Sequence, residues 1–105
     1  KIRKEKGGTI MVKITPAAVE AVRKELSDIL EKGEKPFVRL TMGIGWGGPQ
    51  LRLALEESAL DSDEIIQEQD IQFLVNERDK VYFNDVKVDY VKALFGGGQF
   101  KLLRI

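Results

Sequence analysis

The hydrophobic pattern changes its period once along this chain, at Lys35-Pro36, and this change limits the fold more than any other feature. Before it, apolar residues recur at helical spacing between charged ones, at Val19, Val22, Leu26, Ile29 and Leu30. After it, residues 37–42 alternate with period two, which is typical of a half-buried strand. The pattern predicts the α+β class, with one N-terminal amphipathic helix followed by a mostly antiparallel β region.

The boundaries of the helix carry recognisable signals. Thr15 is a good N-cap, Pro16 suits the first helical position, and Ile14 with Val19 has the spacing of a hydrophobic staple. Gly33 is the predicted terminator. We interpret the apolar face of this helix as core, with a helix that contacts a partner as the alternative.

Short strands separated by turn signals are predicted for the rest of the chain. Residues 51–55 favour a returning strand, and a helix that opens at Pro49 is the alternative, because leucine, alanine and glutamate are good helix formers. Asn84-Asp85 is the predicted hairpin turn, and residues 76–80 are a loop or a single helical turn. The other strand candidates are 65–68, 71–75, 81–83, 86–90 and 100–103, with a glycine break at 96–98.

Composition and charge exclude several classes of function. Lysine plus arginine and aspartate plus glutamate both count 17, so no net field attracts nucleic acid or an anionic membrane, and neither is expected as a partner. No apolar run approaches the roughly 18 residues of a membrane span and no secretory signal is recognisable, so the cytoplasm is the expected location. The chain has no cysteine and no histidine, which removes thiolate nucleophiles, thiolate metal ligands and the usual proton shuttle. We therefore expect no enzyme activity and no catalytic, cofactor-binding or metal-binding residue.

The start of the chain differs from the rest. Residues 1–10 show no periodicity, whereas Met11-Val12-Lys13 reads like the natural beginning of a protein. We predict that residues 1–10 are a disordered or non-native extension and that residues 11–105 form a single domain.

Two glycine motifs and one acidic motif lack the context or the residues that their usual functions require. Gly43, Gly45 and Gly48 satisfy the dinucleotide pattern G-x-G-x-x-G, but that pattern must open a helix, whereas a strand is expected here. Gly45 to Gly48 also fits the G-x-x-G loop of a KH domain, without the basic platform that nucleic acid requires. Residues 61–64 resemble a fragment of a calcium loop without its glycine and distal glutamate, so a solvated turn is favoured.

Several stretches match a known family in order along the chain. Residues 14–18 are similar to an opening I-T-x-x-A, and residues 45–56 to the signature G-C-S-G-x-x-Y-x-L-x-L-D/E. Residues 75–91 are similar to V-D-x-x-S-x-x-Y-L-x-G-x-x-I-D-Y-V, and residues 98–102 to the G-F-x-F that follows. On these motifs the chain resembles the HesB/IscA family, the A-type proteins of iron-sulfur cluster assembly. The resemblance implies a single HesB/IscA-like α+β domain over residues 11–105.

The chain departs from this family at the residues that would bind a cluster. The resemblance places the first cluster-ligating cysteine of the family at Trp46, and Leu51 replaces the usual tyrosine. The family's other two cysteines form a pair beyond the last strand, and the printed sequence ends at Ile105 without them. Clusters need thiolate or, in special centres, imidazole ligands, and an indole nitrogen is only a hydrogen-bond donor. We expect a protein related to cluster assembly that has lost its ligands and binds no cluster or other cofactor.

Trp46, the only tryptophan, has two interpretations. The indole either fills space left by the lost cluster site or packs in the core, or it is a displayed anchor for a partner. The candidate binding loop consists of Gly43, Gly45, Trp46, Gly47 and Gly48. The expected partners are copies of the same chain or other iron-sulfur assembly proteins. The alternative function is a non-metal module for protein binding or self-association through this loop.

Overall fold

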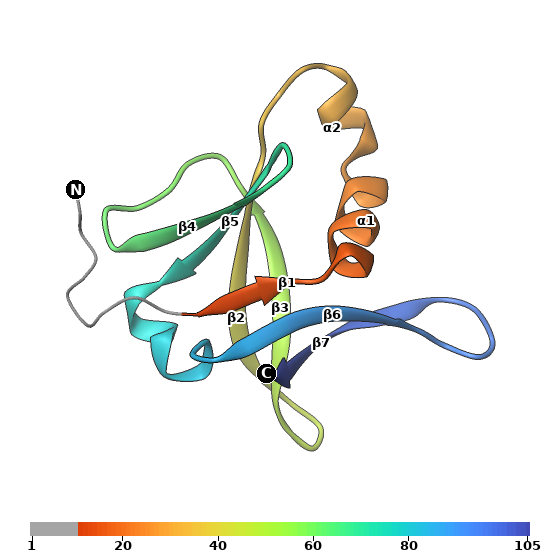
Figure 1. Cartoon of the computed structure of the whole chain (residues 1–105), viewed down its shortest axis with the longest axis vertical. Coiled ribbons are helices and arrows are strands. Elements are labelled where there is room, and N and C mark those ends of the chain that lie inside the picture. Colours follow the sequence, from red (N-terminus) through yellow and green to blue (C-terminus); the bar gives the residue numbers. More distant parts are fainter. Residues whose placement is uncertain (1–10) are drawn as a thin grey trace.

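The computed structural model describes residues 11–105, so the predicted extension over residues 1–10 lies outside the described part of the chain. Its helices and strands (Figure 1) follow in the order β1 (Val12–Ile14), α1 (Pro16–Glu25), α2 (Ser27–Glu31), β2 (Phe37–Gly45), β3 (Gly48–Glu56), β4 (Asp63–Glu68), β5 (Ile71–Asn76), the 3-10 helix η1 (Glu77–Tyr82), β6 (Val86–Lys92) and β7 (Gly98–Arg104). Among the residues described, no helix has the length and apolarity needed to cross a membrane.

The strands form two sheets, which confirms the α+β class. One sheet has the order β1-β6-β7 and the other the order β3-β2-β5-β4. Three of the five strand pairs are antiparallel, and β1 with β6 and β2 with β5 are the parallel ones. The prediction of a mostly antiparallel β region is therefore confirmed, and β3 and β7 each lie at an edge of their sheet.

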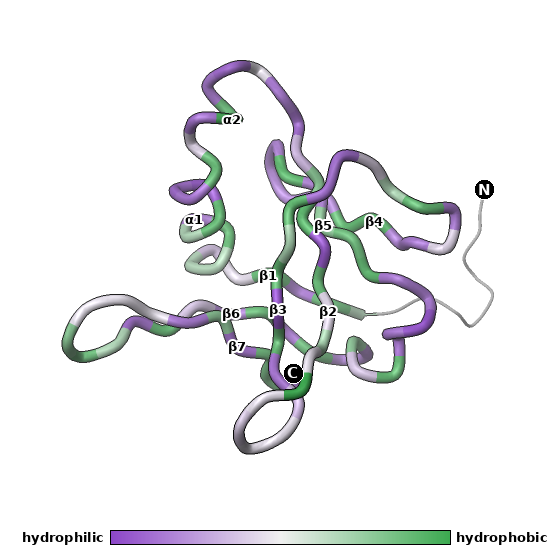
Figure 2. The backbone as a smooth tube through the Cα atoms, turned by 180° about the vertical axis from the view of Figure 1, so that it is seen from behind, coloured by the Kyte–Doolittle hydropathy of each residue, from purple (hydrophilic) through white to green (hydrophobic). Residues whose placement is uncertain are grey.

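The core lies between α1 and the inner faces of the two sheets. Helix α1 contributes Ala18, Val19 and Val22, all of which are buried, so the interpretation of its apolar face as core is confirmed. The strands contribute fully buried side chains such as Phe73 from β5 and Val88 from β6. Figure 2 shows hydrophobic residues recurring along these elements with hydrophilic residues between them.

Thr15 joins the start of α1 to strand β6. Its Oγ1 accepts a hydrogen bond from the Ala18 N–H at 3.2 Å, as predicted for an N-cap, and donates one to Asp89 Oδ1 at 2.7 Å. This bond, together with one donated by the Tyr90 N–H, lowers the pKa of the Asp89 carboxyl. The predicted single helix is divided at Leu26, while its predicted end is confirmed by Gly33, which has a φ of +81°.

Strand β3 is confirmed, and two other local predictions are wrong. Residues 48–56 pair with β2 over their whole length, so the alternative helix opening at Pro49 is wrong. Residues 81–83 were expected as a strand, but 81 and 82 belong to η1 and 83 follows it. Asn76 is the N-cap of η1, and its Oδ1 accepts a hydrogen bond from the Arg78 N–H at 3.2 Å. Asn84-Asp85 is therefore no hairpin turn, because β6 pairs instead with β1 and β7, which come from opposite ends of the described chain. The helical-turn alternative for residues 76–80 is confirmed.

A buried ion pair holds the larger sheet together. Arg39 of β2 is 7% exposed, and its Nη1 and Nη2 each donate to a different carboxylate oxygen of Asp63 at 2.7 Å. Its Nε lies 3.2 Å from Glu56 at the end of β3. Asp63 also accepts hydrogen bonds from the Leu60 N–H and from Asn76 of β5. The hydrogen bonds from Arg39 hold the pKa of the Asp63 carboxyl well below its usual range, although burial opposes them.

Replacing Asp63 by asparagine tests this pair. Asp63→Asn leaves the Arg39 guanidinium buried without its bidentate partner, so the free energy of unfolding at pH 7 should fall by about 3 kcal/mol. Urea denaturation followed by circular dichroism measures the change. Asp61→Asn, at an exposed position two residues away, is the matched control and should change little.

The depressed pKa of Asp63 predicts how the free energy of unfolding depends on pH. Because the folded-state pKa of Asp63 is depressed, its stabilisation is present above the unfolded-state pKa of about 4 and is lost as the pH falls towards the folded-state value. The unfolding free energy of the wild type should therefore decrease more steeply below about pH 4 than that of Asp63→Asn. Parallel curves for the two proteins would contradict this assignment.

Candidate functional site

The glycine-rich stretch forms the tip of the hairpin between β2 and β3, which extends away from the body of the molecule (Figure 1). The two strands stay in register from Phe37 opposite Glu56 to Gly45 opposite Gly48, so Trp46 and Gly47 are the only two residues of the turn. Gly47 and Gly48 have φ values of +86° and +111°. Side chains rarely adopt this backbone region, so the turn itself requires both glycines.

The other two glycines of the loop leave space for side chains of β3. A Cβ atom at Gly43 would collide with the Arg52 side chain, and a Cβ atom at Gly45 would collide with that of Gln50. Both β3 side chains therefore lie flat over the glycines of β2 on the same face of the hairpin. Gln50 also directs its Nε2 to the Trp46 carbonyl oxygen at 3.5 Å. The candidate loop is thus an ordered hairpin whose glycines serve two distinct purposes.

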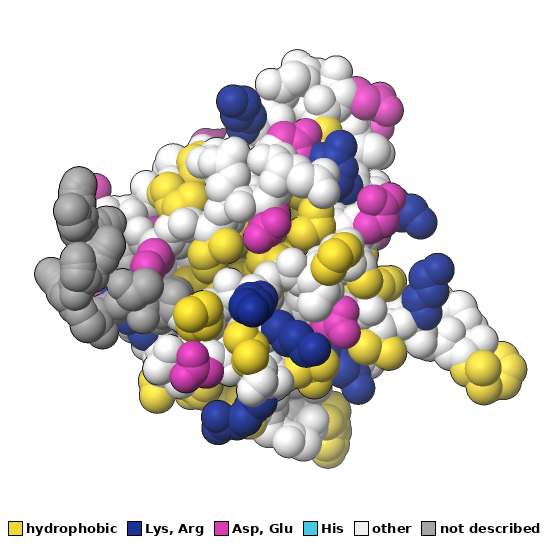
Figure 3. All heavy atoms as spheres, in the orientation of Figure 1, with side chains coloured by type: hydrophobic (Ala, Val, Ile, Leu, Met, Phe, Trp, Pro, Cys, Tyr) yellow, Lys and Arg dark blue, Asp and Glu magenta, His cyan; other side chains and the backbone are white. Residues whose placement is uncertain are grey.

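Trp46 is displayed at the tip of this hairpin. Trp46 is 98% exposed, and Ile44 on the preceding strand is 81% exposed. The interpretation that the indole fills a vacated site or the core is therefore wrong, because the two-residue turn carries it beyond the strands that border the core. Figure 3 shows hydrophobic side chains at the tips of both protruding hairpins, β2–β3 at the bottom and β6–β7 at the right.

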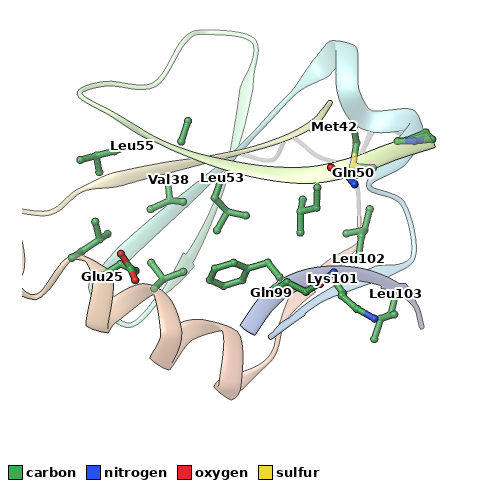
Figure 4. Close-up of a pocket in the computed structure, with 16 residues that line it drawn as sticks. Glu25, Val38, Met42, Gln50, Leu53, Leu55, Gln99, Lys101, Leu102 and Leu103 are labelled. Atoms are coloured by element: carbon green, nitrogen blue, oxygen red, sulfur yellow. The ribbon is translucent and has the colours of Figure 1, made fainter. Parts of the chain in front are cut away.

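An apolar groove runs beside the same hairpin, and no motif in the sequence predicts it directly. The groove has a volume of about 890 Å³ and lies between β3 on one side and α1 and β7 on the other (Figure 4). Its apolar lining includes side chains of α1 and its C-cap and of β2, β3 and β7, among them Val22, Leu26, Val38, Met42, Leu51, Leu53, Leu55, Phe100 and Leu102. The alternation of leucines in residues 51–55 predicts one wall, but the facing wall comes from distant β7.

The acidic motif of residues 61–64 is structural. Asp61 and Ser62 form an exposed turn, in agreement with the favoured reading, but the Asp63 side chain is buried in its pair with Arg39 and is not solvated. Within residues 11–105, no group of three or more aspartate, glutamate, histidine or cysteine residues is arranged to hold a metal ion. The rejection of the dinucleotide motif is confirmed, because Gly43 and Gly45 lie in β2 and Gly48 opens strand β3, so no helix follows the motif.

The donor atoms at the hairpin tip do not fit an iron-sulfur cluster. The tip offers backbone groups and the indole of Trp46, whose nitrogen donates a hydrogen bond and has no lone pair for a metal. The whole sequence contains neither a thiol nor an imidazole that would replace it. Carboxylates are hard ligands and are not the thiolate set that iron-sulfur clusters require.

Comparisons with known proteins agree on one fold. Residues 10–101 match the sequence model of the family described as iron-sulphur cluster biosynthesis. The structure is similar to a crystal structure of IscA with a 2Fe-2S cluster, with a TM-score of 0.72 and 23% sequence identity, covering 90% of this chain and 85% of that chain. No curated protein sequence matches this chain.

Two further solved structures have the same fold. A protein from Aquifex aeolicus, solved in solution by NMR, has a TM-score of 0.72 at 21% identity and covers 92% of this chain and 94% of its own. Escherichia coli SufA, described as involved in the biosynthesis of iron-sulfur clusters, has a TM-score of 0.69 at 19% identity and covers 89% of this chain and 84% of its own.

A substitution at Gly47 tests the geometry of the hairpin tip. Gly47→Ala should lower the free energy of unfolding by about 1 kcal/mol, because a side chain at positive φ is strained while the surrounding space is open. Gly47→Asn should lose less, since asparagine tolerates this region better. Chemical denaturation followed by circular dichroism compares the two variants, and equal losses would show that φ is not the cause.

Proposed function

The chain belongs to the iron-sulphur cluster biosynthesis family, and we propose that it takes part in cluster assembly through protein contacts without binding a cluster itself. The observation that carries this proposal is the residue at the hairpin tip. Where the resemblance places the first cluster-ligating cysteine of the family, this chain has Trp46, which is 98% exposed and cannot ligate iron.

The ligand chemistry supports the loss of cluster binding. A cluster bound by one chain needs several thiolates or imidazoles, and none of the 105 residues supplies either group. The ion pairs of the described residues engage carboxylates such as Asp63 and Glu56 with Arg39, so these acids serve the fold. The proposed role therefore keeps the family fold and replaces the cluster-binding position by a surface for another protein.

The proposed partners are other iron-sulfur assembly proteins or copies of this chain. Tryptophan, with tyrosine and arginine, is enriched among the residues that dominate binding energy at protein interfaces, because its indole offers a large rigid apolar surface at a small entropic cost. No constellation of a nucleophile, a base and an orienting group is found among residues 11–105, and we propose no catalytic role. The cytoplasmic location and the division into an extension and a single domain stay predictions.

A second candidate function is favoured by the exposure of the same loop. Ile44 and Trp46 together display an apolar tip, and residues 43–51 contain no charged residue. Such a tip suits a protein-binding or self-association module that has no connection with metal. Both candidate functions use the hairpin tip as the binding surface, and they differ in whether the bound protein takes part in cluster assembly. They are separated by whether the partner that binds the tip is itself a component of cluster assembly.

Anaerobic reconstitution tests the loss of cluster binding. The purified chain is incubated with ferrous iron, sulfide and a thiol reductant, desalted, and examined by absorption spectroscopy and iron counting. We expect a colourless protein with less than about 0.1 iron per chain, because no side chain provides the soft ligands that a cluster needs. A cysteine-bearing member of the family, treated in the same way, is the positive control.

One outcome would overturn the proposal. A visible chromophore that survives desalting, with stoichiometric iron and sulfide, would show that the chain binds a cluster by ligands other than cysteine and histidine. Repeating the experiment with Trp46→Ala would then show whether the hairpin tip takes part.

A further inference from the structure

The hairpin between β6 and β7 ends in a second apolar tip, separate from the Trp46 tip. Leu94 is 88% exposed and Phe95 is 93% exposed, and residues 93–100 contain no charged side chain. This tip protrudes from the body of the molecule at the right of Figure 1. Neither side chain lines the groove described above, so the tip is a convex point and not part of that groove. Two adjacent large apolar side chains at such a point mark a candidate contact surface.

An ordered turn holds these two side chains away from the strands. The Ala93 N–H donates a hydrogen bond to the Gly97 carbonyl oxygen at 3.1 Å. Gly96 and Gly97 have φ values of +89° and +71°, a backbone region that suits glycine, and the space around both is open. The tip can therefore be surrounded by another molecule without displacing neighbouring parts of the chain.

A cation and an amphipathic ring lie at the neck of this hairpin. Lys92, the last residue of β6, is exposed and pairs with Gly98, the first residue of β7. A Cβ atom at Gly98 would collide with the Tyr90 hydroxyl, so the Tyr90 ring leans along the hairpin towards the tip. This ring also packs edge-on against Phe100, with the ring centroids 4.9 Å apart. The hairpin thus carries apolar side chains at its tip and polar ends of long side chains just behind them.

The outer face of the β1-β6-β7 sheet is basic. Lys13 of β1 lies opposite Lys87 of β6, and Lys101 of β7 shares their face and lies nearer the tip. These positions alternate with residues that pack in the core. Asp89 is the only acid in the three strands, and the Thr15 hydroxyl donates a hydrogen bond to its carboxylate at 2.7 Å. Figure 3 shows Lys and Arg side chains over this sheet and beside the hydrophobic tip at its right.

The zero net charge of the chain, on which the expectation of no membrane partner rests, conceals an uneven distribution. Residues 86–105 contain four basic side chains and one acidic one, whereas residues 53–77 contain eight acidic side chains and no basic one. The acidic stretch includes β4 and β5, which lie on the side of the molecule opposite the β6–β7 tip (Figure 1). Charges more than about 8 Å apart are largely screened at physiological salt, so a nearby surface senses the local excess and not the total.

We propose that the β6–β7 hairpin binds the surface of an anionic lipid bilayer, with Leu94 and Phe95 inserted at the headgroup boundary. Lys92 then lies beside the anionic headgroups, and Lys101 lies three residues along β7 from Gly98, which is about 10 Å of strand. Apolar side chains gain by leaving water, and each lysine near an anionic membrane adds its own attraction. This inference goes beyond the function proposed above, because it uses a different tip and does not depend on whether the chain binds a cluster.

A bilayer fits these observations better than a protein partner. A protein would need a pocket shaped for two side chains on a convex turn, whereas the boundary of a bilayer accepts apolar side chains of any shape. Tyrosine is enriched at this boundary, because its ring is apolar and its hydroxyl is polar, and Tyr90 leans towards it. Insertion stays shallow, because the irregular backbone of residues 93–97 cannot enter the hydrocarbon core without water.

The Trp46 tip lacks the cations that this contact requires. Residues 43–51 contain no charge, and the next basic residue, Arg52, has its side chain over Gly43 on the strand and not at the turn. We therefore assign the lipid contact to Phe95 and not to Trp46.

Cosedimentation with vesicles tests the contact. The full chain is mixed with vesicles of phosphatidylcholine that contain about 30% phosphatidylserine, and with vesicles of phosphatidylcholine alone. We expect binding to the anionic vesicles that is at least tenfold weaker on the neutral ones, since two lysines near the surface contribute about fivefold each. Raising the salt concentration should also weaken it.

Substitutions locate the contact on the chain. Phe95→Ser should weaken binding to the anionic vesicles at least tenfold, because it removes the larger apolar side chain of the tip. Lys101→Gln should weaken it about fivefold. Lys35→Gln removes the same charge from an exposed position before β2 and is the matched control, which should leave binding unchanged. All three positions are exposed, and circular dichroism checks that each variant folds.

A tryptophan at the tip reports on insertion. In the double variant Trp46→Phe/Phe95→Trp, the only tryptophan lies at the proposed contact. On anionic vesicles its emission should shift to the blue, and its quenching by acrylamide should fall several-fold, because the ring leaves water. In the wild type, whose only tryptophan is Trp46, neither property should change.

Several results would overturn the inference. These are a chain that does not sediment with anionic vesicles, a tip tryptophan that stays fully quenchable on them, a blue shift of Trp46 in the wild type, or equal losses in Lys101→Gln and Lys35→Gln. Polyglutamate tests the other class of partner. A chain that ignores the vesicles but binds polyglutamate through Lys101 would assign the lysines to an acidic protein and overturn the lipid contact.

Discussion

The pair between Arg39 and Asp63 is the interaction on which the larger sheet depends. It joins the third residue of β2 to the first residue of β4, and Glu56 and Asn76 extend it to the ends of β3 and β5. The Arg39 guanidinium has little access to bulk water, because the residue is only 7% exposed, so these carboxylates balance its charge. The network sits at the end of the β2–β3 hairpin that is opposite Trp46, and it fixes the base from which the tip projects.

Much of the fold follows from local signals in the sequence. The change of period at Lys35-Pro36 separates α1 and α2 from the strands that follow them, and the hydroxyl of Thr15 begins α1 where its capping geometry predicts. Strand β1, which precedes α1 and joins the sheet of β6, is not predicted. Local signals fail where the pairing is distant. Residues 81–83 have the composition of a strand, but β6 already has a neighbour on each side, in β1 and β7, so residues 81–83 cannot pair with β6 as a hairpin would require. The chain turns through η1 at this point and leaves Val81 79% exposed.

Some features of the candidate site can also be predicted from the sequence, whereas others depend on distant pairing. The residue that replaces the family's first cysteine is visible in the sequence through the resemblance, and the absence of thiols is visible in the composition. The exposure of Trp46 is not, because glycines around an aromatic suit both a packed and a displayed indole. What decides between them is the register of β2 with β3, which makes Trp46 part of a two-residue turn. The groove needs Phe100 and Leu102 opposite the leucines of β3, and this juxtaposition exists only in three dimensions.

The parallel pairing of β1 with β6 has a consequence for how the protein is made. Val12 lies opposite Val86, and the Thr15 hydroxyl meets Asp89 across 74 positions of sequence. A ribosome releases the chain from its N-terminus, so β1 emerges long before the strand that receives it. Contacts of such high sequence separation slow folding, because a long loop must close before they form. Until β6 emerges, the apolar side chains Val12 and Ile14 have no sheet to join, and the nascent chain must carry them in a form that avoids aggregation.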